Sequence, residues 1–141
     1  MQEITNAEEF ERFCRLEKAI LFVMAEWSQP AFVSRSVVNE WLRSQSGFFE
    51  QEELDVRCIN QDLQFAQDWL MQQAARFLDS EKEAESWTFL QANGTLLWLR
   101  KGVVVAYNSS TAYAGIRTLY EQTVKAGFTR MAQEKDHGED N

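Results

Sequence analysis

An amphipathic segment followed by a short apolar run opens the chain. Thr5 or Asn6 can cap a first helix, in which apolar residues recur at helical spacing. These residues are Phe10, Phe13 and Cys14, and we group Ile4 with them. Residues 19–25 (AILFVMA) are continuously apolar, which is typical of a strand that is covered on both faces. The sequence therefore predicts a helix and then a buried strand.

Helical spacing returns after Pro30, the only proline in the chain. We expect a second helix in this segment, and Gly47 is a plausible end for it. Its apolar positions are Val33, Val37, Val38, Trp41 and Leu42.

A second strand and a long third helix come next. Residues 54–60 carry apolar side chains at Val56, Cys58 and Ile59, which predicts the strand. Asn60 or Asp62 can then cap the helix. The apolar stripe of this helix consists of Leu63, Ala66, Leu70, Ala74 and Phe77, with Trp69 beside it.

The last third of the chain predicts a hairpin and a final helix. Residues 79–86 (DSEKEAES) are polar and fit a loop or a helix end, whereas residues 87–93 fit no single element. Residues 95–99 and 103–107 are apolar, and the turn at 100–102 predicts that they pair as antiparallel strands. The final helix has a cap among Ser109, Ser110 and Thr111, carries Ile116, Leu119, Tyr120 and Val124, and ends near Gly127.

This order of elements predicts an α/β fold. A helix joins the first two strands, which makes them parallel, and the hairpin adds antiparallel strands. The result is a central mixed sheet of about four strands with helices on both faces. We expect one domain over residues 1–128, and a polar, disordered tail over residues 129–141.

The negative charge is concentrated in the middle of the chain. The net charge is −8, and residues 50–85 alone carry ten acidic and three basic side chains. One interpretation is a solvated surface. The other is a surface that attracts a basic protein partner, formed by Asp79, Glu81, Glu83 and Glu85. Nucleic acid is not an expected partner, because phosphate contacts require clustered cations.

Several kinds of chemistry have no support in the sequence. His137 is the only histidine and lies in the polar tail, so we expect no catalytic triad, no metal site and no cofactor. The acidic N-terminus lacks a signal-peptide pattern, and the longest apolar run is too short to span a membrane. We therefore expect a cytoplasmic protein in which Cys14 and Cys58 are free thiols.

Three segments resemble the thioredoxin family. Residues 21–31 (LFVMAEWSQPA) are similar to its first central strand and active-site turn, whose core reads Trp-Cys-Gly-Pro-Cys. Residues 56–62 (VRCINQD) are similar to the next strand, and residues 94–102 (GTLLWLRKG) to the segment that starts at a cis-proline and a threonine. The resemblance covers residues 3–127, with an enlarged helical insertion at about 62–94. It implies a thioredoxin-like fold.

The departures from the family pattern affect its redox positions. Ser28 and Ala31 stand where the family has its two cysteines, so the chain has no dithiol at this turn. Phe22 matches the buried acid of the family, and Cys58 matches its partner lysine. Gly94 replaces the cis-proline. Because disulfide exchange needs a thiolate and a second, resolving thiol, we expect the redox chemistry of the family to be absent.

The same positions define a candidate binding site. A cis bond before a non-proline residue costs about 2.5–4 kcal/mol, so we predict a trans Asn93–Gly94 bond and a reshaped loop beside Trp27. In the family, this loop and the motif tryptophan hold the substrate chain. Here Trp27 either contacts a peptide or packs against the loop. The candidate residues are Trp27, Ser28, Gln29, Pro30, Ala31, Asn93, Gly94 and Thr95.

The hypothesis that follows is a redox-inactive, thioredoxin-like domain that acts as a protein-binding or chaperone-like assembly module. In that case the chain is not an enzyme. One alternative is an enzyme with altered thiol chemistry that uses Cys14 or Cys58. Another is a structural subunit or homodimer.

Overall fold

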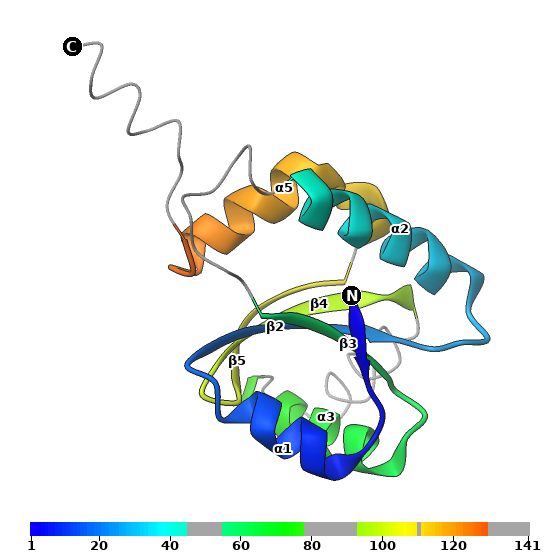
Figure 1. Ribbon diagram of the computed structural model, residues 1–141, viewed down its shortest axis with the longest axis vertical. Coiled ribbons are helices and arrows are strands. Elements are labelled where there is room, and N and C mark those ends of the chain that lie inside the picture. The colour runs from blue at the N-terminus through cyan, green and yellow to red at the C-terminus, as the bar shows by residue number, and fades with distance from the viewer. Residues whose placement is uncertain (45–54, 78–92, 110, 130–141) are drawn as a thin grey trace.

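The computed structural model describes residues 1–44, 55–77, 93–109 and 111–129. Figure 1 shows the helices and strands along the chain. Their bounds are β1 Gln2–Ile4, α1 Ala7–Cys14, β2 Lys18–Met24, α2 Gln29–Ser44, β3 Val56–Asn60, α3 Gln64–Phe77, β4 Thr95–Arg100, β5 Val103–Asn108 and α5 Thr111–Lys125. The end expected for α2 at Gly47 lies outside the described residues. Of the tail expected over residues 129–141, only Thr129 is described, and it is buried.

The strands form one mixed sheet in the order β1-β3-β2-β4-β5. β3 runs parallel to both β1 and β2, whereas β4 runs antiparallel to β2 and to β5. The predicted α/β class is confirmed, but the sheet has a fifth strand. Our grouping of Ile4 with the first helix was wrong, because Ile4 belongs to β1 and pairs with Ile59. A strand of three residues is too short to show a period in the sequence.

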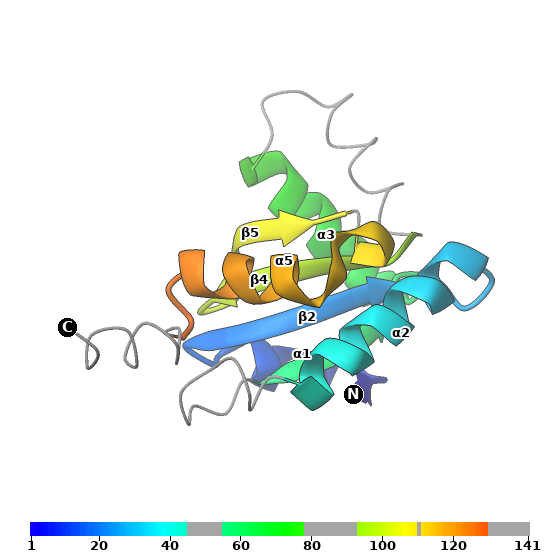
Figure 2. The same cartoon turned by 90° about the horizontal axis from the view of Figure 1, so that it is seen from above.

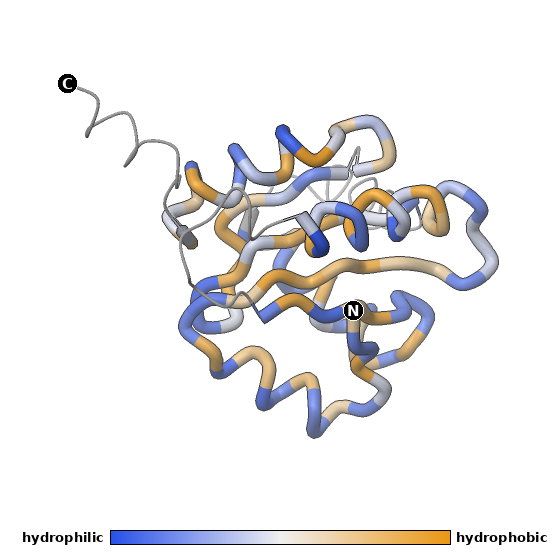
Figure 3. Tube along the Cα trace, turned by 45° about the horizontal axis from the view of Figure 1, so that its top comes forward, coloured by the Kyte–Doolittle hydropathy of each residue, from blue (hydrophilic) through white to orange (hydrophobic). Residues whose placement is uncertain are grey.

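Helices cover both faces of the sheet. Figure 1 shows α1 and α3 on one face and α2 and α5 on the other. β2 lies between β3 and β4, and all of its residues except Lys18 are buried, as its unbroken apolar run predicted. The apolar segments of the chain accordingly meet at the sheet, and polar segments lie on the outer helix faces (Figure 3).

The two faces hold separate hydrophobic cores. The core under α1 and α3 includes Phe10, Phe13 and Leu70. The core under α2 and α5 is built around Trp41, Trp98 and other large side chains. The core role predicted for Trp41 is confirmed, since its side chain is fully buried.

The start of α1 is capped as expected. The Asn6 side chain accepts a hydrogen bond from the backbone N–H of Glu9, at 2.9 Å. In return, the Glu9 carboxylate accepts hydrogen bonds from the Thr5 hydroxyl and the Asn6 amide. The first of these contacts satisfies the Glu9 N–H, a backbone donor that the first helical turn leaves free, and the other two hold the Glu9 side chain over the cap.

The hairpin is confirmed, and its turn has the geometry of a two-residue loop. Lys101 and Gly102 both have positive φ, 49° and 78°, which a type I′ turn requires. A bulge interrupts the β4–β5 pairing between Trp98 and Leu99. On the free edge of the sheet, the Val104 N–H donates to the side-chain oxygen of Gln73 in α3, at 3.2 Å.

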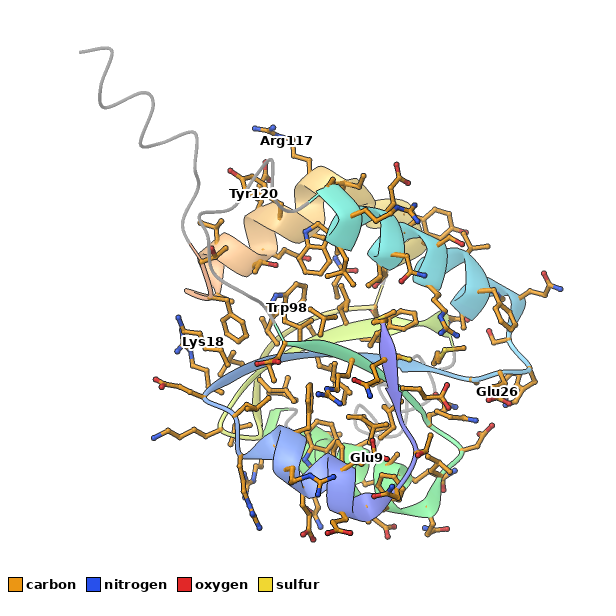
Figure 4. The ribbon with its side chains drawn as sticks, in the orientation of Figure 1. Glu9, Lys18, Glu26, Trp98, Arg117 and Tyr120 are labelled. Carbon is orange, nitrogen blue, oxygen red and sulfur yellow. The ribbon has the colours of Figure 1, made fainter. Side chains whose placement is uncertain are left out.

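The last helix is interrupted, which its periodicity did not reveal. Gly115 leaves the helical conformation with φ 79° and ψ 163°. After this break, α5 is fixed on the sheet by buried contacts. The Trp98 indole N–H donates to the Thr123 hydroxyl at 3.1 Å, and that hydroxyl donates to the Leu119 carbonyl. Figure 4 labels Trp98 in the layer between the sheet and α5, and Tyr120 on α5.

Candidate functional site

The loop between β2 and α2 starts its helix with a buried serine. The Ser28 hydroxyl accepts a hydrogen bond from the backbone N–H of Ala31 at 3.4 Å, and the Ser28 N–H donates to the Ala25 carbonyl. Ser28 is therefore the N-cap of α2, and only 5% of its surface is exposed. Ala31 is fully buried one turn later, so neither residue presents a reactive group to solvent.

Gly94 lies in close contact with α2. All peptide bonds in the described ranges are trans, including Asn93–Gly94, and Gly94 has φ +88°. A Cβ atom at Gly94 would come within 2.6 Å of the Ser34 Cβ and 3.0 Å of the Phe22 ring. The Ser34 hydroxyl also donates to the Asn93 carbonyl at 2.9 Å. The predicted trans bond is confirmed, and Ser34 fixes this loop against α2.

Trp27 lies on the outer side of the turn and is 66% exposed. Its indole N–H donates to the Asp62 carboxylate at 2.9 Å. Asp62 is itself held by a hydrogen bond from its N–H to the Asn60 side chain. The Trp27 side chain is thus hydrogen-bonded to the loop after β3. It does not line the cleft described next.

A cleft of about 550 Å³ separates the first turn of α2 from the first turn of α5. Its wall includes three of the predicted site residues, Gln29, Pro30 and Asn93. The rest of the lining was not foreseen and consists of Val33, Ser34, Ser109, Ala112 and Tyr113. Tyr113 is 92% exposed and Val33 is 54% exposed, so apolar surface borders the opening.

Comparison with known proteins gives one informative match. No family model matches the chain, and no curated protein matches its sequence. A solved structure described as "A putative oxidoreductase with a thioredoxin fold" aligns over 89% of this chain and 92% of its own, with a TM-score of 0.57 and 9% identity. The chain has a thioredoxin fold. At this identity the match shows the fold alone, and the described activity belongs to that other protein.

The thioredoxin fold places the two other departures from the family pattern side by side. Phe22 and Cys58 are direct partners in the parallel register of β2 and β3. Both are fully buried and belong to the core under α2 and α5. The two residues compared above with an acid and a lysine of the family are therefore adjacent and buried in one apolar core here.

The two thiols of this thioredoxin fold lie on opposite faces of the sheet. Cys14 packs at the edge of the core under α1 and α3, whereas Cys58 is buried in the core on the opposite face of the sheet. Burial, with Glu11 as the smaller cause, raises the pKa of Cys14 from 9.0 to about 11. Burial likewise raises the pKa of Cys58. Both thiols are therefore protonated near neutral pH.

Of the remaining predicted residues, Thr95 is buried at the start of β4. Asp79, Glu81, Glu83 and Glu85 lie outside the described residues. Within the described ranges, no group of three metal-ligating side chains comes together, and no helix is long and apolar enough to cross a membrane.

The residues that line the cleft from α5 and the segment before it were not predicted as site residues, because no sequence motif marks them. The sequence around Ser109, Ala112 and Tyr113 predicts the start of a helix. It does not indicate that this helix start faces α2. Their approach depends on β5 ending at the same edge of the sheet as β2, which is a property of strand order.

Proposed function

We propose that this chain is a redox-inactive thioredoxin-fold domain that binds a partner protein, as a chaperone-like assembly module. One observation carries the proposal. The start of α2, where a thiolate would have to lie, presents a buried capping serine beside an open cleft with apolar borders.

The argument against disulfide exchange is chemical. The reaction needs an accessible thiolate and a second thiol that resolves the mixed disulfide. Cys14 and Cys58 lie on opposite faces of the sheet and have raised pKa values. A reducing compartment such as the cytoplasm, where we expect the protein to act, would keep both reduced.

The argument for binding rests on shape and exposure. A cleft of about 550 Å³ has room for a few side chains of a polypeptide. Val33 and Tyr113 at its borders are exposed apolar side chains, and Phe32, next to Val33 in the sequence of α2, is exposed as well. Exposed apolar groups gathered around a cleft mark interaction sites more often than scattered ones do.

The first experiment removes the apolar borders of the cleft. Partners are captured from lysate of the source cell with wild type, with Val33→Ser/Tyr113→Ala and with a matched control. Val105→Ser/Met71→Ala is the control, because Val105 and Met71 are also exposed and apolar but do not line the cleft. We expect a partner that the cleft variant loses and the control retains. Equal capture by all three proteins would refute the cleft as the binding site.

The acidic stretch is the second proposed contact. Reversing the charges of Asp79, Glu81, Glu83 and Glu85 to lysine should weaken capture of the same partner. The loss should be greatest at low salt, because exposed charges are screened as salt rises. If the charge-reversed variant captures the same amount of partner as wild type, the acidic stretch is not a contact, and the cleft remains as the proposed binding site.

The description of the solved structure as an oxidoreductase favours a second candidate, a thiol-dependent activity. An insulin-reduction assay compares wild type with Cys14→Ala/Cys58→Ala. Activity that disappears in this variant would support an enzyme and defeat the proposal of a redox-inactive module. A homodimer, the remaining alternative, would appear as a concentration-dependent sedimentation coefficient.

A further inference from the structure

Basic side chains gather at one end of the molecule. The described residues carry eleven basic and eleven acidic side chains, so their charges cancel. Nine of the eleven basic residues nevertheless lie at the end where β2 and β3 begin, and we call this set the basic end. It consists of Arg12, Arg15, Lys18, Arg43, Arg57, Arg76, Arg100, Lys101 and Lys125.

Four of these residues lie in the last turns of helices. Each helix begins near the carboxyl end of the parallel strands and runs back toward the basic end, as α2 and α5 do in Figure 2. The last turns hold Arg12, Arg43, Arg76 and Lys125. Cations there offset the negative pole of the helix dipole.

Arg15 is the C-cap of α1, so the dipole of that helix favours it as well. Helix dipoles do not explain Lys18, Arg57, Arg100 and Lys101, which lie on strands and on the hairpin turn. Lys18 and Arg100 are direct partners in the β2–β4 register, where like charges destabilise a sheet. The Lys101 N–H donates to the carbonyls of Leu16 and Glu17, which brings the hairpin turn beside Arg15 and Lys18. Arg15, Lys18 and Lys101 form no ion pair within the described part of the chain.

Arg100 connects this cluster to the end of α5. Its guanidinium donates to the carbonyls of Ala126 and Gly127, both at 3.1 Å, and lies 5.2 Å from the centre of the Phe128 ring. Within the described residues, the acidic groups on the strands and loops of this end are Glu3, Glu17 and Asp55, and Glu11 lies in the last turn of α1. Figure 4 shows Lys18 at this edge and Glu26 at the opposite one.

A hollow of about 410 Å³ adjoins the cluster beneath the starts of β1 and β3. Its lining includes the apolar side chains of Phe13 and Leu16 together with Arg12 and Arg57. Asp55 and Glu9 also line it. The Glu9 carboxylate is already engaged by Thr5 and Asn6 at the cap of α1. The hollow therefore combines apolar walls with the guanidinium groups of Arg12 and Arg57 and the carboxylate of Asp55. Arg12 already pairs with Glu8 at 3.8 Å, which leaves Arg57 as the guanidinium available to a ligand.

We propose that the basic end binds an acidic segment of a partner protein, with an apolar side chain of that segment in the hollow. Carboxylates would pair with the cations that helix dipoles leave unexplained, and Arg57 would hold the segment at the hollow. Nucleic acid fits less well, because the whole chain carries a net charge of −8 and the cations lie on separate loops. This site lies at the opposite end of the molecule from the α2–α5 cleft, so either proposal can fail alone.

The test uses the full chain and labelled ten-residue peptides in fluorescence anisotropy. The main probe contains glutamates and one central phenylalanine. A second probe replaces that phenylalanine by alanine, a third replaces the glutamates by lysines, and a fourth is single-stranded DNA of similar length. We expect binding of the main probe, weaker binding without phenylalanine, no binding of the lysine peptide, and loss of affinity as salt rises.

Protein variants then locate the contact. Arg15→Gln/Lys101→Asn removes two exposed charges of the basic end. It should lower the affinity for the main probe by roughly three- to tenfold. Arg57→Gln should reduce the preference for phenylalanine. The matched control is Arg35→Gln/Arg117→Gln, which removes the same charge from the bodies of α2 and α5 and should leave affinity unchanged.

Three results would overturn the proposal. One is equal affinity for the glutamate and lysine peptides. Another is the same loss in the control as in Arg15→Gln/Lys101→Asn. The third is tighter binding of DNA than of the main probe, which would assign the basic end to a polyanion.

Discussion

Gly94 and Gly115 have similar φ values but different surroundings. Their φ values are +88° and +79°. A Cβ atom at Gly94 would strike Ser34 at 2.6 Å, whereas a Cβ atom at Gly115 would meet nothing within 4 Å. The two glycines can therefore separate the cost of an unfavourable φ from the cost of a steric clash.

We predict that Gly94→Ala destabilises the protein more than Gly115→Ala. Both variants carry backbone strain of about 1–3 kcal/mol. Gly94→Ala adds about 1–3 kcal/mol because Ser34 and Phe22 must move. Urea unfolding of both variants measures the difference. Equal urea midpoints for the two variants would mean that Ser34 moves away from the added Cβ at little cost in free energy.

The raised pKa of Cys14 predicts a loss of stability at high pH. In the unfolded chain the thiol ionises near its ordinary pKa of 9.0, but in the folded protein it keeps its proton until about 11. The unfolded state therefore binds fewer protons between these values, and the free energy of unfolding falls as pH rises through this window. Cys14→Ala should show a smaller fall in urea unfolding at pH 8, 9 and 10.

Alkylation gives an independent check of the same thiol. Near pH 8 both native cysteines should react slowly with iodoacetamide, because the thiolate is the reactive species. Rapid labelling of the folded protein at that pH would contradict the raised pKa values. Labelling in urea is the control for reagent quality.

Among the elements, α2 depends most visibly on its first residues. Ser28 caps it, and Pro30 occupies its first turn, where a missing N–H costs nothing. We predict that Ser28→Ala destabilises the protein by about 0.5–2 kcal/mol, and that Ser28→Asp, which retains a capping oxygen, costs less. Thermal unfolding measures both. Ser36→Ala is the matched control, since its hydroxyl only donates to the Phe32 carbonyl on an exposed helix face.

The sequence predicted elements well where apolar residues form long, regular patterns. β2 was predicted from its continuous apolar run and α2 from the helical spacing of its apolar residues. The β4–β5 hairpin was predicted from its turn, in which Gly102 has a positive φ. β1 was missed because it spans three residues, and the break at Gly115 was missed because the apolar spacing continues through it. Three of the eight residues that line the cleft were predicted, and Ser109 and Tyr113 were missed because strand order brings them there.

At the scale of the whole molecule, charge is distributed unevenly. The described body is neutral, yet its cations crowd at one end while the full chain is strongly acidic. Both arrangements place like charges near one another, and such repulsion opposes folding.

We predict that sodium chloride raises the midpoint of thermal unfolding by roughly a few degrees between 0.01 and 0.15 M, because the Debye length falls from about 30 to about 8 Å. Arg15→Gln/Lys101→Asn should respond less than wild type, since it carries less crowded charge. A midpoint that falls with salt would mean that attractive pairs dominate the surface.

The left-handed backbone at Gly94 also limits how this fold could be re-engineered for sulfur chemistry. Installing cysteines at positions 28 and 31 would restore the two side chains of a reactive turn. Proline, however, fixes φ near −65°, and the chain holds position 94 at +88° against Ser34. An engineer would have to rebuild the main chain of that loop and shrink Ser34 before the cysteines could act on a disulfide presented there.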